Sequence, residues 1–174
     1  MGKIPKNERE KPMIKNTPKK SDPRTDLLRS AIEHRATWFA LMVEEARKQG
    51  LDDSFASNAV MKCGQFHGLN KYPRTDDLPT FTKAFANQDV INTFEMDVFE
   101  ATDDKLSINF HYCPLVEAWR KLGLPEDQMP RLCDMAMDGD RGIISTYDKF
   151  SFDLGDTIAK GGEFCEIRIS KKPE

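Results

Sequence analysis

The spacing of apolar residues changes near residue 94, and this change constrains the fold more than any other feature of the sequence. Up to that point apolar residues recur every three or four positions, which is typical of helices that pack on one face. From there, Phe94, Met96 and Val98 alternate with acidic residues, which is typical of a strand with one buried face. The sequence therefore predicts an α+β fold, with a helical N-terminal half packed on a small antiparallel sheet.

The first helix is expected to begin at Asp22-Pro23 and to end at Gly50. Asp22 can cap the helix, and Pro23 suits its first position. Two rows of apolar residues make its apolar face broad, so we expect neighbours to cover this helix on more than one side. The rows are Leu28, Ile32, Phe39, Val43 and Ala46, and Leu27, Ala31, Trp38 and Leu41.

Two more helices are expected before residue 94. The second starts at Asp52 or Asp53 and runs to about His67, because Gly68 then interrupts the pattern. A shorter helix follows Asp76, with three apolar side chains turned inward. The first half of the chain is therefore helical.

The second half is expected to hold four strands and two short inserted helices. Residues 102–105 turn the chain between the first two strands and make a hairpin. Two later strands complete the sheet, because an isolated hairpin is marginal in water. The strands are expected at 94–98, 106–112, 149–154 and 163–169, and the helices at 114–122 and 125–137.

The charges divide the chain into a basic tail and an acidic body. The net charge is -3, but residues 1–25 contain eight Lys or Arg against three Asp or Glu. The acidic body argues against a nucleic-acid partner, because phosphate binding needs a clustered positive face. Residues 1–22 are charged and contain several prolines, so we expect a disordered basic leader before a single domain over residues 23–174.

Other sequence features limit location and redox state. No run approaches the roughly 18 apolar residues of a membrane span, so we expect a cytoplasmic protein without a membrane partner. The four cysteines, Cys63, Cys113, Cys133 and Cys165, are widely spaced in a chain large enough to fold without disulfides, and we expect reduced thiols. The sequence allows a homo-oligomer.

Cys113 is the residue with the clearest physical reason to be reactive. It stands where the strand pattern ends and Pro114 opens a helix, and the positive end of a helix lowers the pKa of a nearby thiol. His111 lies two residues earlier on the same predicted face and could exchange a proton with it. Both residues could instead have ordinary structural roles, Cys113 as a small buried residue and His111 as an exposed one.

Three further residues are weaker candidates. Asp140 lies in a glycine-flanked segment, 138–142, that predicts a loop, and Arg141 beside it could pair with a carboxylate. Cys165 alternates with apolar residues on a predicted strand, which favours a core position. A Cys and His pair can begin a zinc site, but the other ligands are scattered, so no cofactor is expected and zinc stays an alternative.

The last third of the chain resembles the L-2-amino-thiazoline-4-carboxylic acid hydrolase family. The resemblance covers about sixty residues and rests on several short runs in a fixed order. These are HYCPLVEAW at 111–119, LGLP at 122–125, Leu132-Cys133, Asp140, and TIAKGGEFCEIR at 157–168. Cys113, Asp140 and Cys165 match conspicuous family positions.

This resemblance implies hydrolysis of a small cyclic amidine. Water adds to the ring carbon between nitrogen and sulfur, and the C–N bond opens to give S-carbamoyl cysteine. We expect Cys113 to be the nucleophile, Asp140 the acid or base, and His111 a proton carrier. The expected substrate-binding residues are Cys165, Arg168, Arg141 and Thr157. Alternatives are another small-molecule substrate on the same scaffold, or a sensory domain that binds a small ligand or a metal.

Overall fold

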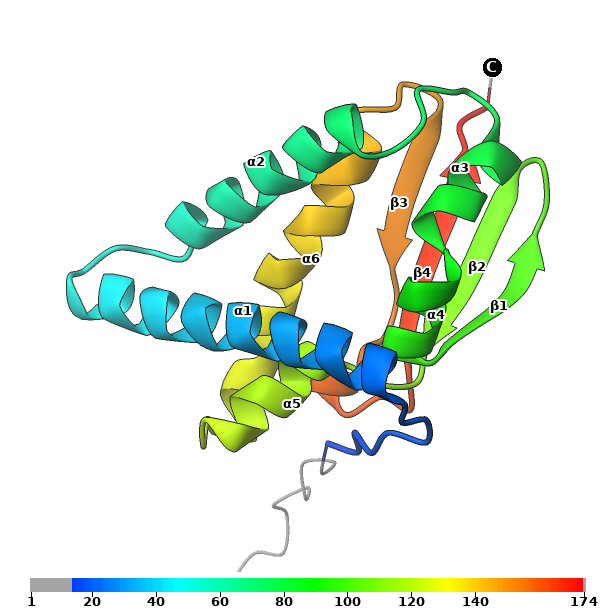
Figure 1. Cartoon of the computed structure of the whole chain (residues 1–174). Helices are drawn as coiled ribbons and strands as arrows, with labels where there is room; N and C mark the ends of the chain where they lie inside the picture. The colour runs from blue at the N-terminus through cyan, green and yellow to red at the C-terminus, as the bar shows by residue number, and fades with distance from the viewer. Residues whose placement is uncertain (1–13, 174) are drawn as a thin grey trace, which may run out of the picture.

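The computed structural model describes residues 14–173 and has the expected α+β architecture (Figure 1). The N-terminal half holds α1 (Pro23–Lys48), α2 (Ser54–Asn70), α3 (Leu78–Phe85) and α4 (Gln88–Phe94). The strands are β1 (Met96–Ala101), β2 (Lys105–Phe110), β3 (Phe150–Leu154) and β4 (Cys165–Lys171). Between strands lie α5 (Pro114–Lys121), α6 (Met129–Ser145) and the 3-10 turns η1 (Glu126–Gln128) and η2 (Ile158–Lys160).

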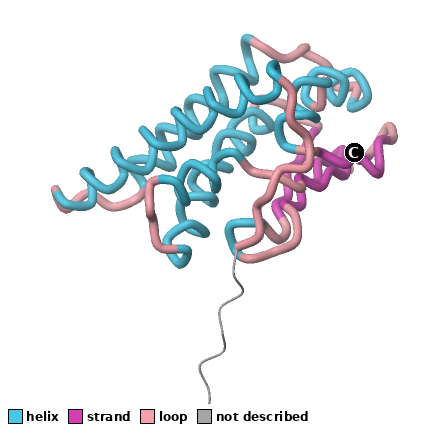
Figure 2. Tube along the Cα trace, turned by 60° about the horizontal axis from the view of Figure 1, so that its bottom comes forward, coloured by secondary structure: helices cyan, strands magenta, loops and turns pink. Residues whose placement is uncertain are grey.

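The sheet is antiparallel throughout, in the order β1-β2-β4-β3. Figure 2 shows the strands gathered at one side of the molecule and the helices filling the other. Phe81 of α3 packs against Phe150 of β3, with ring centroids 5.6 Å apart, so helices cover one face of the sheet. Along β4, Cys165 and Ile167 are buried on that face, whereas Arg168 takes the opposite one.

The first helix begins as predicted but is covered on one side only. Asp22 accepts hydrogen bonds from the N–H groups of Arg24 and Thr25. The buried side of α1 packs on α5, where Trp119 Nε1 donates to the carbonyl of Ala36 at 3.1 Å. The second apolar row, which includes Trp38, stays exposed. The expectation that neighbours within the chain cover both rows is therefore wrong.

Glycines that suggested helix breaks lie inside helices. Helix α2 continues through Gly68, and α6 continues through residues 138–142, so the loop predicted there is wrong. The reason is close packing: a Cβ at Gly64 would collide with the carbonyl of Gly139, and one at Gly142 with the carbonyl of Met61. These glycines let α2 and α6 approach each other rather than turn the chain.

The change of apolar spacing coincides with Glu95, which stands alone between α4 and β1. Its backbone is left-handed, with φ 49, which is uncommon for a residue other than glycine. Its buried carboxylate accepts a hydrogen bond from the guanidinium of Arg29 at 3.1 Å. Arg29 also donates to the carbonyls of Asn92 and Thr93. This buried pair fixes α1 to the point where helix gives way to strand.

Residues 14–20, here called the N-terminal strap, pack on the domain. Ile14 and Asn16 are buried, and Glu95 Oε1 accepts the backbone N–H groups of Lys19 and Lys20 at 2.7 and 2.8 Å. The predicted leader over residues 1–22 is therefore wrong for its last nine residues, because body side chains bind that segment. Residues 1–13 lie outside the described part of the chain.

Candidate functional site

Three of the four cysteines gather in the interior and form what we call the thiol cluster: Cys113, Cys133 and Cys165. All three are buried, and they come from the start of α5, the first turns of α6 and the start of β4. They lie close enough for negative charge on Cys113 to raise the pKa of both Cys133 and Cys165. Cys63 on α2 is exposed and lies outside the cluster.

The segment around η2 completes the cluster. The backbone N–H of Ile158 donates to Cys165 Sγ at 3.3 Å, and a side-chain hydrogen bond from Thr157 lowers the pKa of Cys133. Thr157 also caps η2, because its hydroxyl accepts the N–H of Lys160 at 3.3 Å. Thr157, predicted from the family resemblance as a binding residue, is therefore next to the thiols.

Cys113 occupies the N-cap position of α5, at the helix end that the sequence predicted, but its thiol is not activated there at rest. Burial raises the pKa of Cys113, while the amides of Leu115 and Val116 in the first turn act in the opposite direction. The predicted lowering of this pKa is wrong, because loss of hydration outweighs the helix end. Burial likewise raises the pKa of Cys133 to about 12. The resting cluster is therefore neutral.

Asp140 lies on the same face of α6 as Cys133, two turns further along. Seven residues of helix span about 10 Å. Burial raises the pKa of Asp140 to about 6, although the cations Arg35 and Arg141 act to lower it. Burial also raises the pKa of Tyr72 to about 12, and the charge of Asp140 adds to that shift. Asp140 is thus a carboxyl that titrates near neutral pH, the range required of an acid or base catalyst.

Three predicted site residues, His111, Arg168 and Arg141, lie outside the thiol cluster and have other contacts. The ring of His111 packs edge-on against Phe164, with centroids 5.5 Å apart, and within residues 14–173 no hydrogen bond or ion pair joins it to Cys113. Arg168 lies on the outer face of the sheet, where it donates to Asn109 Oδ1 and to the carbonyl of Ile108.

Arg141 points along the other side of α6. Its guanidinium bonds Asp134 and Asp138, each at 2.8 Å. Both ion pairs occupy the Arg141 guanidinium, which the sequence analysis predicted to bind a substrate carboxylate. Arg35 of α1 is a second cation whose charge acts on Asp140.

Metal ligands do not converge in the part of the chain that the structure describes. No group of three or more His, Cys, Asp or Glu side chains there is placed to hold a metal ion. Nor does any helix between residues 14 and 173 combine the length and apolar character of a membrane crossing.

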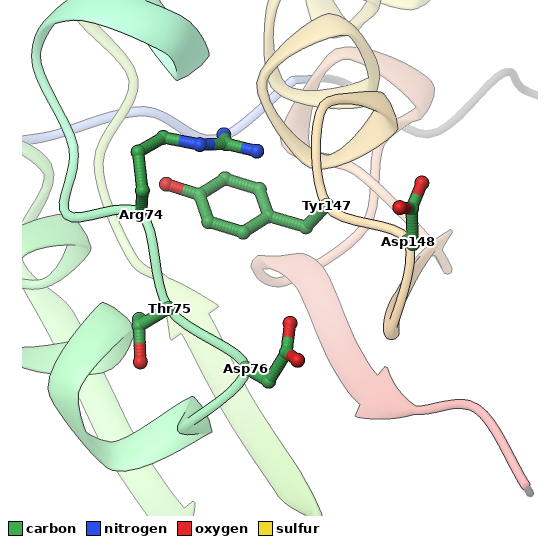
Figure 3. Close-up of a pocket in the computed structure, with 5 residues that line it drawn as sticks. All are labelled: Arg74, Thr75, Asp76, Tyr147 and Asp148. Carbon is green, nitrogen blue, oxygen red and sulfur yellow. The ribbon is translucent and has the colours of Figure 1, made fainter.

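A surface hollow of about 270 Å³ lies at the far end of α6 and is shown in Figure 3. Its walls include Arg74, Asp76, Tyr147 and Asp148. The guanidinium of Arg74 stacks on the ring of Tyr147 at 4.6 Å and donates to the carbonyl of Thr146 at 2.6 Å. Arg74 therefore ties the end of α2 to that of α6, and the hollow is separate from the thiol cluster.

Comparison with known proteins decides the family. A sequence model described as L-2-amino-thiazoline-4-carboxylic acid hydrolase matches residues 29–169. The chain belongs to this hydrolase family. The match extends from α1 to the last strand, so the family includes the helical half as well as the thiol cluster. No curated protein sequence matches the hydrolase chain significantly.

Solved structures of similar fold include a subunit of a trafficking complex. It is a trafficking protein particle complex subunit 3 from Naegleria fowleri, covalently bound to palmitic acid, with 16% identity and a TM-score of 0.53. The similarity covers 81% of this hydrolase-family chain and 95% of that chain. At this identity the similarity concerns the fold alone.

Several site residues could not be found from the sequence. The helical pattern around Cys133 does not show that this thiol lies near Cys113. Arg35 and Tyr72 come from segments without a motif, and only the tertiary fold brings them near Asp140. Asn16, which contacts Cys113, falls in the segment predicted to be disordered.

Proposed function

We propose that this protein opens a small cyclic amidine, such as L-2-amino-thiazoline-4-carboxylate, to S-carbamoyl cysteine. Family membership supports a hydrolase. The observation that carries the proposal is the placement of Asp140, with its pKa raised to about 6, on the same face of α6 as Cys133 of the thiol cluster. Positions seven residues apart on one helix face are about 10 Å apart along its axis, a spacing that a small ring can bridge.

In this proposal Asp140 recognises the amidine. A protonated amidine is a planar cation with two N–H donors, which pairs well with a carboxylate. Above a pH of about 6 Asp140 is ionised and can take this role. Arg35, the cation that acts on Asp140, then binds the substrate carboxylate in place of Arg141 and Arg168, which have other partners.

Cys113 is proposed as the nucleophile, activated by the substrate itself. Its thiol is protonated at rest, because burial raises its pKa. A cationic amidine bound beside it would lower that pKa, because an opposite charge at close range favours the thiolate. Reactivity would then arise only when the correct ligand is bound.

The bond changes balance without an added reagent. The thiol adds across the ring C=N bond, and its proton goes to the ring nitrogen. The ring C–N bond then breaks, with a proton from the exocyclic amine, and leaves a dithiocarbonimidate, in which the former ring carbon joins Cys113 to the substrate sulfur and keeps one C=N bond. Water adds across the remaining C=N bond, and loss of the Cys113 thiol releases S-carbamoyl cysteine. Asp140 moves the protons of both additions.

A screen of small thiazolines and cyclic amidines, followed by NMR, tests the proposal. We expect ring opening by the native protein and a loss of at least about a hundredfold for Asp140→Asn. Asp103→Asn, in the exposed hairpin turn, is the matched control and should keep full activity. Ring opening that survives Asp140→Asn unchanged would remove Asp140 from the mechanism.

A second candidate is a domain that carries an acyl group on a buried thiol. It is favoured by the neutral, buried state of the thiol cluster and by the palmitic acid bound covalently to the Naegleria protein of similar fold. Intact mass spectrometry separates the two. A protein mass raised by a fatty acyl group that hydroxylamine removes would support this candidate, and an unmodified mass with amidine turnover would reject it.

A further inference from the structure

Helix α1 presents an exposed apolar row to solvent, which we call the α1 stripe. Its members fall on one side of the helix at spacings of three, four or seven residues. They are Leu27, Ala31, Trp38, Leu41 and Met42. Leu27 is 71% exposed, Trp38 62% and Met42 57%, so no other part of residues 14–173 covers them. Soluble proteins seldom expose such a row without a partner for it.

The stripe is symmetric about its own centre, between His34 and Arg35. A second copy of α1 running in the opposite direction would place the partner's Met42 against Leu27, and the partner's Trp38 against Ala31. The largest side chain thus meets the smallest, in the way that ridges fill grooves between packed helices. This self-complementarity is what a two-fold symmetric interface requires, because each contact then occurs twice.

The apolar area of the stripe fits a dimer of ordinary size. Its four large side chains expose on the order of 450 Å² if each carries about 200 Å² when free. A standard interface takes roughly 800 Å² from each partner, of which somewhat over half is apolar. The stripe therefore supplies about the apolar area of one side of such an interface.

The charges at the ends of the stripe agree with the same arrangement. Antiparallel packing about this centre places the partner's Glu45 beside Arg24, and both are exposed. Within the chain Arg24 pairs with Asp89 and Glu45 with Lys48, so the contact between copies would join two existing ion pairs. Opposite charges at the rim of an interface favour the correct register over others. The stripe also ends where these charged residues begin.

We propose that two copies of this chain pair through the α1 stripe, antiparallel and across a two-fold axis. The sequence predicted cover for both apolar rows of this helix, and a second copy supplies the cover that the chain itself does not. The stripe lies on the side of α1 opposite to its buried face. Its centre is next to Arg35, the proposed ligand of the substrate carboxylate, but the pairing does not rest on the proposed reaction and is tested by association alone.

Sedimentation equilibrium of the full chain tests the pairing. We expect a dimer at micromolar concentration, and a dissociation constant raised at least about a hundredfold by Trp38→Glu, because aromatic residues at the centre of interfaces dominate binding. Leu69→Glu alters an equally exposed residue of α2 and should leave the dimer intact. A chain that remains monomeric at about 100 micromolar would overturn the proposal.

Cross-linking tests the register. In a Cys63→Ser background, Leu27→Cys with Met42→Cys should be joined rapidly between chains by a short bis-maleimide. Leu27→Cys alone is the control, because antiparallel pairing about this centre separates the pair of residues 27 in the two chains by about 22 Å along the axis. Equal cross-linking of both pairs would overturn the register, and so would dimers that survive Trp38→Glu unchanged.

Discussion

The side chain of Asn16 hydrogen-bonds both polar groups of the Cys113 backbone. Asn16 Oδ1 accepts the N–H of Cys113 at 2.9 Å, and Asn16 Nδ2 donates to its carbonyl at 3.0 Å. Both residues are buried, so water cannot replace these bonds. The position of the proposed nucleophile therefore depends on the N-terminal strap, which is nearly one hundred residues away in the sequence.

Replacing Asn16 with Ala should destabilise the protein and loosen Cys113. The buried N–H of Cys113 would lose its partner, at a cost of about 1–3 kcal/mol, whereas the Cys113 carbonyl would keep the N–H of Glu117. For a chain of this length we expect a Tm lower by on the order of 5 °C or more. Hydrogen exchange of the Cys113 amide should accelerate in the variant. Asn70→Ala, which removes an exposed hydrogen bond to the Phe66 carbonyl, is the control and should change neither measurement appreciably.

Replacing Arg29 with Met should be among the most destabilising single changes in α1. The variant leaves the buried carboxylate of Glu95 without its cation, which typically costs about 3–5 kcal/mol. Chemical denaturation measures this loss. Arg24→Met, on the same helix as Arg29, breaks an exposed ion pair with Asp89 of α4 and should cost far less. Equal losses for the two variants would mean that burial of the Arg29 pair has no energetic importance.

The contact between α2 and α6 predicts opposite effects for two neighbouring glycines. Gly142→Ala should destabilise the fold by about 1–3 kcal/mol or more, because the new methyl group collides with the carbonyl of Met61. Gly139→Ala meets only Val60 Cγ1 at 3.6 Å and should stabilise α6 by up to about 1 kcal/mol. Thermal unfolding of both variants checks the sign, and a stabilising Gly142→Ala would contradict the close packing.

The ionisation of Asp140 should make stability depend on pH between about 4 and 6. Burial raises the pKa of this carboxyl from 3.8 to about 6, so in this window the folded state binds more protons than the unfolded one. Stability therefore falls as the pH rises through the window, and the loss reaches on the order of 2 kcal/mol above it.

Asp140→Asn should remove this dependence. The variant should gain about 2 kcal/mol over the native protein at pH 7 and little at pH 4, while it loses the proposed activity. Urea unfolding at both pH values measures the difference. An equal effect at pH 4 and pH 7 would show that ionisation of Asp140 is not the cause.

Local patterns predicted much of the fold. The cap at Asp22 and the hairpin follow from short-range chemistry, and the structure confirms both. The glycines of α2 and α6 were misread for a physical reason. A glycine that ends a helix and a glycine that admits a neighbouring helix look alike in a sequence, and only the partner helix distinguishes them.

The candidate site was less predictable. The family resemblance identified Cys113, Asp140 and Cys165. Whether these side chains are protonated depends on their burial, which the pattern of α5 and β4 does not reveal. The helix end at Cys113 predicted a lowered pKa, and the interior raises it instead. The contact of Asn16 with Cys113 joins residues that share no local pattern.

The rate of ring opening by Cys113→Ala, measured beside Cys63→Ala, tests the central claim most directly. Cys113 belongs to the buried cluster and Cys63 is exposed on α2, so the two variants remove the same atoms from different places. With L-2-amino-thiazoline-4-carboxylate we predict that Cys113→Ala lowers kcat/KM at least about a thousandfold, as expected for loss of a nucleophile, and that Cys63→Ala leaves it unchanged. Full turnover by Cys113→Ala would contradict the account.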